Sequence, residues 1–204
     1  RKSAAAFNNL GVVFQVLQRH DDAKRNFQIA VQLSPNVPLY HRNLAEAFRF
    51  SSEMTLACNH GRIAADLAPG SAYAQGRHAQ DLLFAARFAE ALPFARKGVE
   101  LEPKYSDGWR YVRLILNALK REVEAAEAGE KAIEADPSNS LIYAEMAASI
   151  RASGKYKEAV EMSRRAIAIG PIWSGPYNTA ASAARSLGDY DFAEKCWKAA
   201  VAVD

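Results

Sequence analysis

Residues 4–37 read AAAFNNLGVVFQVLQRHDDAKRNFQIAVQLSPNV, and this pattern recurs along the chain. The proline of this stretch, Pro35, is the first of five prolines that stand 34 residues apart; the others are Pro69, Pro103, Pro137 and Pro171. A constant period of this length indicates an array of structural repeats. It predicts a single array over residues 1–204, with repeats at 4–37, 38–71, 72–105, 106–139, 140–173 and 174–204.

Each repeat contains two apolar stretches with the spacing of an amphipathic α-helix. In the first repeat these are Phe7, Leu10 and Phe14, followed by Phe27 and Ala30. The periodic proline ends the second helix, because proline lacks an amide hydrogen and clashes with the preceding turn. One pair of helices cannot bury its apolar face alone, so neighbouring pairs must stack. The pattern therefore predicts an all-α solenoid with two helices per repeat.

The residues at fixed places in the repeat resemble the signature of the tetratricopeptide repeat (TPR) family. Counted from residue 4, signature positions 4, 7, 8, 11, 20, 24, 27 and 32 hold Phe7, Leu10, Gly11, Phe14, Ala23, Phe27, Ala30 and Pro35. Position 20 is alanine in every repeat, as Ala23, Ala57, Ala91, Ala125, Ala159 and Ala193. The resemblance implies a right-handed superhelical solenoid of six TPR hairpins whose first helices face a concave groove.

Composition narrows the class of protein. Half of the 204 residues are hydrophobic, which is enough for a continuous core, and a formal net charge of +3 does not indicate nucleic-acid binding. No apolar run reaches the roughly 18 residues of a membrane span. The chain does not begin with methionine, so we expect it to be a segment of a longer protein, with any catalytic domain outside it.

The chemistry-bearing residues form no catalytic or metal motif. The sequence has no phosphate-binding loop, HExxH zinc motif, paired CxxC or serine nucleophile elbow. We therefore expect no enzyme activity, cofactor or metal in this segment. Cys58 and Cys196 lie four repeats apart, too distant for a disulfide, and free cysteines favour an intracellular, cytoplasmic location. We expect His41, His60 and His78 to be packed or hydrogen-bonded structural residues.

Polar side chains on the first helices are the candidate binding residues. By the resemblance they face the groove, where asparagine can bind a peptide backbone and arginine a carboxylate. Because the arginines outnumber the acids there, we expect a protein or peptide ligand with acidic groups. We also expect these arginines to be exposed and to contribute little to folding. The candidate residues are Asn8, Asn9, Arg42, Asn43, Arg49, Tyr73, Arg77, Arg110 and Asn117.

The middle repeats depart from the family pattern. Gln75, His78 and Arg113 stand where apolar or small residues are usual, and Gly61 and Gly129 stand where a large residue is usual. Such departures mark either function or strain, or simple drift of a repeat. Trp173 occupies a turn with no core position, so it either covers the seam between two repeats or contacts a partner.

The sequence leaves three interpretations open. The first is a protein-interaction scaffold that binds an extended peptide or partner helix in the groove, without nucleic acid and without membrane insertion. The second is the targeting or substrate-recognition arm of a larger enzyme such as a glycosyltransferase. The third, RNA binding by a pentatricopeptide-like array, is disfavoured by the strict period and the mild charge.

The apolar last helix has no polar cap, so we expect a flanking segment or a second copy of the chain to cover it.

Overall fold

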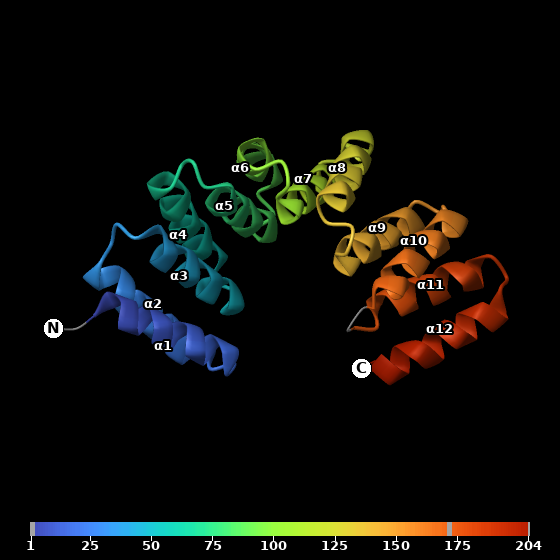
Figure 1. Cartoon of the computed structure of the whole chain (residues 1–204), viewed down its shortest axis with the longest axis horizontal. Coiled ribbons are helices and arrows are strands. Elements are labelled where there is room, and N and C mark those ends of the chain that lie inside the picture. The colour runs from blue at the N-terminus through green and yellow to red at the C-terminus, as the bar shows by residue number, and fades with distance from the viewer. Residues whose placement is uncertain (1–2, 171–172, 204) are drawn as a thin grey trace. The chain divides into compact units, whose positions relative to one another are not determined.

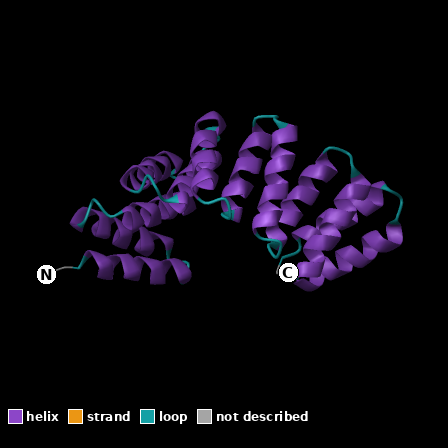
Figure 2. Cartoon of the chain, turned by 45° about the horizontal axis from the view of Figure 1, so that its top comes forward, coloured by secondary structure: helices purple, strands orange, loops and turns teal. Residues whose placement is uncertain are grey.

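The computed structural model describes residues 3–170 and 173–203, and every regular element in these residues is an α-helix (Figure 2). The helices follow one another as hairpins, one hairpin per predicted repeat (Figure 1). None of the described helices is long and apolar enough to cross a membrane. The described helices are α1 (Ala4–Val16), α2 (His20–Leu33), α3 (Pro38–Phe50), α4 (Met54–Leu67), α5 (Ala72–Phe84), α6 (Phe88–Leu101), α7 (Ser106–Ala118), α8 (Glu122–Ala135), α9 (Ser140–Ala152), α10 (Tyr156–Ile169), α11 (Gly175–Ser186) and α12 (Tyr190–Val203).

The helix boundaries confirm the role predicted for the periodic prolines. Five second helices end at the residue that lies two positions before such a proline, for example Leu33 before Pro35. Pro171, the last of the series, lies outside the described residues. The all-α fold of helical hairpins is therefore confirmed, and the hairpins begin and end where the 34-residue period places them.

The chain divides into two compact units, Arg1–Ala128 and Gly129–Asp204, with the boundary inside α8. In the first unit, Phe27 and Leu44 belong to one buried cluster and Leu82 and Ile115 to another. The second unit has its own clusters, one of them built mainly from alanines of α11. The single array over residues 1–204 stays a prediction, since each unit has a core of its own.

Small residues let the two helices of a hairpin approach closely. A Cβ atom on Gly11 of α1 would lie 2.5 Å from the ring of Phe27 on α2, so only glycine fits there. Phe27 is completely buried as a result. The alanines of position 20 are also buried in every repeat, which explains why the sequence keeps a side chain of one size there.

The turn inside each hairpin contains one residue with positive φ. Repeats five and six use Gly154 and Gly188, with φ of +81° and +80°, whereas the first four repeats use other residues. Ala86, for example, has φ of +57° between α5 and α6. The left-handed region costs a residue with a Cβ atom roughly 1–2 kcal/mol. The first four hairpins therefore contain local backbone strain that glycine would relieve.

Replacing Ala86 with glycine is expected to stabilise the first unit by about 1 kcal/mol, because glycine adopts positive φ without steric cost. Urea unfolding followed by circular dichroism measures the change. The matched control is Ala89→Gly, three residues away and exposed on helix α6, where glycine should destabilise by about 0.5–1 kcal/mol. Equal effects of the two substitutions would show that the turn conformation does not limit stability.

Candidate functional site

All nine candidate binding residues lie in the first unit, on four successive first helices: Asn8 and Asn9 on α1; Arg42, Asn43 and Arg49 on α3; Tyr73 and Arg77 on α5; Arg110 and Asn117 on α7. We call the surface made by these residues the first-helix face. The structure connects seven of them, from α1 to α5, through side-chain contacts. Arg110 lies 3.9 Å from Asp107, and its guanidinium lies 5.7 Å from the Tyr111 ring centroid.

The asparagines of the first-helix face bond to one another. Asn43 Nδ2 donates to Asn8 Oδ1 at 2.8 Å, and Asn8 Nδ2 donates to Asn9 Oδ1 at 3.4 Å. Asn8 and Asn43 are only 4% and 8% exposed, so this bond joins α1 to α3 inside the first unit. Asn9 remains exposed and available to a ligand.

Arg49, Arg77 and Arg110 are largely buried, the last with a side chain 16% exposed, which corrects the expectation of exposed side chains that contribute little to folding. Arg49 Nη1 lies 2.7 Å from Asp81 Oδ1, and Arg77 Nη2 lies 2.8 Å from Glu46 Oε2. Their side chains are 11% and 15% exposed. Glu46 also lies 3.6 Å from Arg49, so the four charges form one network between α3 and α5.

Asp81 is not among the residues predicted from the sequence, because it occupies a position that faces the preceding repeat and holds apolar or small residues elsewhere. Its side chain is 2% exposed. A Cβ atom on Gly61 of α4 would lie 2.2 Å from Asp81 Oδ2, so the carboxylate occupies the space that a side chain at position 61 would need. The unusual glycine and the unusual aspartate therefore belong together. A carboxylate at an otherwise apolar repeat position was the signal that could have identified it.

Burial shifts the titration of two groups at this junction. It raises the pKa of Asp81 from 3.8 to about 6, against the opposing effects of Arg49 and Arg77. It lowers the pKa of His78, which is 3% exposed, to about 4. The edge of His78 packs against the ring of Phe94 at a centroid distance of 4.4 Å. His78 is therefore neutral at pH 7, and Asp81 is largely ionised there.

Arg42 and Tyr73 form an accessible part of the first-helix face. The guanidinium of Arg42 lies 4.8 Å from the centroid of the Tyr73 ring, and that of Arg77 lies 5.9 Å from it. Tyr73 is 43% exposed. Arg42 also donates to Asn43 Oδ1 at 3.5 Å, but no carboxylate among the described side chains pairs with it. Of the predicted arginines on α3 and α5, Arg42 alone is left to bind an acid from outside.

Buried His41 and half-buried His60 form a pair in the second repeat, the packed and hydrogen-bonded role that the sequence predicts. His41 Nε2 lies 2.7 Å from the carbonyl oxygen of Pro35, and His41 Nδ1 lies 2.9 Å from His60 Nδ1. Because a carbonyl only accepts, His41 carries its proton on Nε2, and His60 donates from Nδ1. Burial, and then the charge of His41, lower the pKa of His60. Within the described residues, no group of three His, Cys, Asp or Glu side chains could hold a metal ion.

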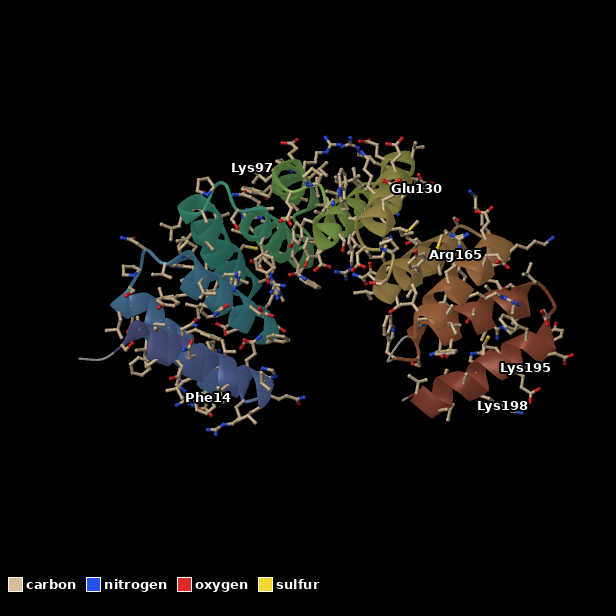
Figure 3. All side chains as sticks on the ribbon, viewed as in Figure 1. Phe14, Lys97, Glu130, Arg165, Lys195 and Lys198 are labelled. Atoms are coloured by element: carbon tan, nitrogen blue, oxygen red, sulfur yellow. The ribbon has the colours of Figure 1, made fainter. Side chains whose placement is uncertain are left out.

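Trp173 is packed against the core of the second unit. It packs against the buried cluster of Tyr143, Ala144 and Ala166, and its indole Nε1 lies 2.5 Å from the place of a Cβ atom on Gly175. Cys58 and Cys196 are both buried and free. Charged side chains such as the labelled Lys97, Arg165 and Lys198 are exposed on second helices (Figure 3).

By sequence, the chain matches no family model and no curated protein. It is similar in structure to a tetratricopeptide repeat protein from Parabacteroides merdae, with a TM-score of 0.81 and 14% identity over 98% of this chain and 78% of that one. It is also similar to TTC0263, a thermophilic TPR protein of Thermus thermophilus, with a TM-score of 0.77 and 18% identity over 89% of this chain and 98% of that one.

The chain has the TPR fold. A third similar structure is that of pilF from Pseudomonas aeruginosa, with a TM-score of 0.78 and 20% identity over 95% of this chain and 88% of that one. Likeness at these identities establishes the fold, and the function has to be argued from the residues of the first-helix face.

Proposed function

We propose that the chain is a protein-interaction scaffold and that the first-helix face of its first unit binds a segment of a partner protein. The observation that carries this proposal is the Arg42–Tyr73 pair. It combines an exposed aromatic ring with a guanidinium that has no carboxylate partner among the described residues. An arginine stacked on a ring keeps its N–H groups free to bind a carboxylate in its plane.

The exposed apolar residues of the same helices define the rest of the partner's chemistry. Phe50 and Phe84 are the last residues of α3 and α5, and both are exposed. His20 stacks on Phe50 at 5.1 Å, and the Arg49 guanidinium lies 5.7 Å from the Phe84 ring centroid. A segment that carries one carboxylate for Arg42 and apolar side chains for the rings would fit this surface.

A pull-down with this chain, followed by mass spectrometry, identifies the partner, and substitutions then locate the contact. Arg42→Ala and Tyr73→Ala are each expected to weaken binding at least about tenfold, which corresponds to roughly 1.4 kcal/mol, because a charge-assisted bond contributes about 1.5–3 kcal/mol. Isothermal titration calorimetry measures the dissociation constants, and circular dichroism checks that both variants remain folded.

The matched control is Lys97→Ala, which removes an exposed charge from the second helix α6 and should leave binding unchanged. Unchanged binding by both Arg42→Ala and Tyr73→Ala would refute the first-helix face as the binding site. Equal losses in Arg42→Ala and Lys97→Ala would indicate a general charge effect instead.

Three finer predictions remain alongside this proposal: an acidic partner, a cytoplasmic location and self-association through the last repeat. Tyr190, Trp197 and Val201 leave an exposed apolar surface on α12, which supports the third. Light scattering that shows a strict monomer at high concentration would contradict self-association.

The length of the parent chain would distinguish an independent scaffold from the recognition arm of an enzyme.

A further inference from the structure

Asp81 lies where three helices of the first unit meet. One carboxylate oxygen pairs with Arg49 of α3 at 2.7 Å, and the other faces the backbone of Gly61 on α4, while Asp81 itself belongs to α5. A buried carboxylate must either remain ionised against a cation or take up a proton, because an isolated charge is costly away from water.

The charged and titratable groups around Asp81 come from several helices. Arg49 and Glu46 of α3 and Arg77 of α5 act directly on its carboxyl group. On α4, the Cys58 thiol senses the charge of Asp81, and its pKa is raised mainly by burial. His78 on α5 is buried, and charged groups from two other helices act on its pKa. These groups are Asp66 and Arg62 of α4 and the ion pair of Arg87 and Glu90 at the start of α6. Among these groups, Arg49 makes the short contact with Asp81.

We propose that Asp81 is a proton-controlled latch on the first-helix face: ionised, it neutralises Arg49, and protonated in mildly acidic solution it releases the charge of Arg49 to that face. Burial supports this assignment, since it raises the pKa of Asp81 to about 6, within the range where mild acid acts. The latch concerns regulation of the surface assigned under the proposed function, and only its effect on binding rests on that assignment.

The charge of the first-helix face follows directly from the state of the latch. With Asp81 ionised, the cluster of Arg42, Arg49, Arg77, Glu46 and Asp81 has a net charge of three minus two, or +1. With Asp81 protonated, the net charge is three minus one, or +2. Glu46 contacts Arg77 at 2.8 Å and lies 3.6 Å from Arg49, so its single charge is shared between two guanidinium groups in either state. Protonation therefore makes the face more attractive to a partner's carboxylate.

The folded chain binds the Asp81 proton more tightly than the unfolded chain, because burial raises its pKa from 3.8 to about 6. The resulting stabilisation is fully present below pH 3.8 and is lost as the pH rises through 6. His78 has the opposite effect: burial lowers its pKa from 6.5 to about 4, so its contribution is present above pH 6.5 and lost as the pH falls through 4. The two groups oppose each other over the same pH range.

Carbon-13 NMR of the chain, with pH titration of the aspartate carboxyl and arginine Nε–H signals, tests the latch without any partner. Asp81, assigned by comparison with Asp81→Asn, should titrate near pH 6. The Nε–H signal of Arg49 should move with the same midpoint and become insensitive in Asp81→Asn. A carboxyl midpoint near 4, or an Arg49 signal that ignores the titration, would overturn the proposal.

Stability gives a second readout. Relative to Asp81→Asn, the unfolding constant of the parent chain should rise about 50-fold between pH 4 and pH 7, because the folded and unfolded pKa values of Asp81 are about 6 and 3.8. His78→Gln serves as the matched control. Relative to this variant, the unfolding constant of the parent chain should fall between pH 4 and pH 7. If the ratio of the unfolding constants of the parent chain and Asp81→Asn does not vary with pH, the latch proposal is wrong. Neither measurement needs a partner, so failure of the latch and failure of the binding face are distinguishable.

Discussion

Replacing Arg49 with methionine is expected to destabilise the first unit by about 3–5 kcal/mol at pH 8. The substitution removes the cation that pairs with Asp81 at 2.7 Å, while the methionine side chain still covers Phe84. Breaking a buried ion pair from one side leaves an uncompensated charge in a site where water cannot solvate it. The loss should shrink at pH 5, because protonation of Asp81 removes that charge. Urea unfolding followed by circular dichroism at the two pH values measures both effects.

Arg62→Ala is the control for this experiment, because Arg62 makes an exposed pair with Asp66 on α4 and its removal should leave stability essentially unchanged. The double variant Arg49→Met with Asp81→Leu should recover most of the lost stability, since two apolar side chains can replace a buried pair without penalty. If Arg49→Met alone is as stable as the parent chain, the Arg49–Asp81 contact contributes nothing to folding.

Placing a large residue at position 61 is expected to destabilise the chain, although two other repeats have one at the equivalent position, Phe27 and Trp197. In Gly61→Leu, even the Cβ atom would lie 2.2 Å from Asp81 Oδ2, so the carboxylate must move and its bond to Arg49 must distort. Overpacking costs about 1–3 kcal/mol, and disturbing the buried pair adds to this, so we expect a loss of about 3 kcal/mol. Denaturant unfolding provides the measurement.

The partner variant for this experiment is Gly61→Leu combined with Asp81→Ala, which removes the carboxylate that the new side chain displaces. The combination should be clearly more stable than Gly61→Leu alone, so that the two substitutions are strongly non-additive. Additive effects would show that Gly61 and Asp81 do not share one space. A stabilising effect of Gly61→Leu by itself would contradict the packing argument altogether.

The sequence predicted the hairpins because their determinants are local. Helical spacing, small residues at fixed positions and Pro35 act within one repeat, and the structure confirms the helix ends they imply. The contacts of the first-helix face could not be predicted in the same way. Asn8 meets Asn43, and Arg49 meets Asp81, only after neighbouring repeats have stacked. The position of a residue in the repeat showed which helix it is on, but not which side chain of the next repeat it contacts.

The correction to the arginines has the same physical origin. The prediction of exposed arginines considered only the acidic residues at groove positions. Asp81 lies at a repeat position that normally faces an apolar neighbour, so it was not included. Gly61 and His78 stood out in the sequence as separate departures from the pattern, and Asp81 is a third irregular residue at the same junction. Their common cause is geometric: one repeat omits a side chain where the next repeat inserts a carboxylate.

Identical apolar surfaces would let any hairpin of a repeat array follow any other, so that a shortened or shuffled array would assemble as readily as the native one. The carboxylate of Asp81 fits only a neighbour that provides both a glycine in its second helix and an arginine near the end of its first. This pairing makes the second and third repeats recognise each other. It therefore fixes the order of these two modules in the chain, in the way that a buried polar contact fixes the register of a coiled coil.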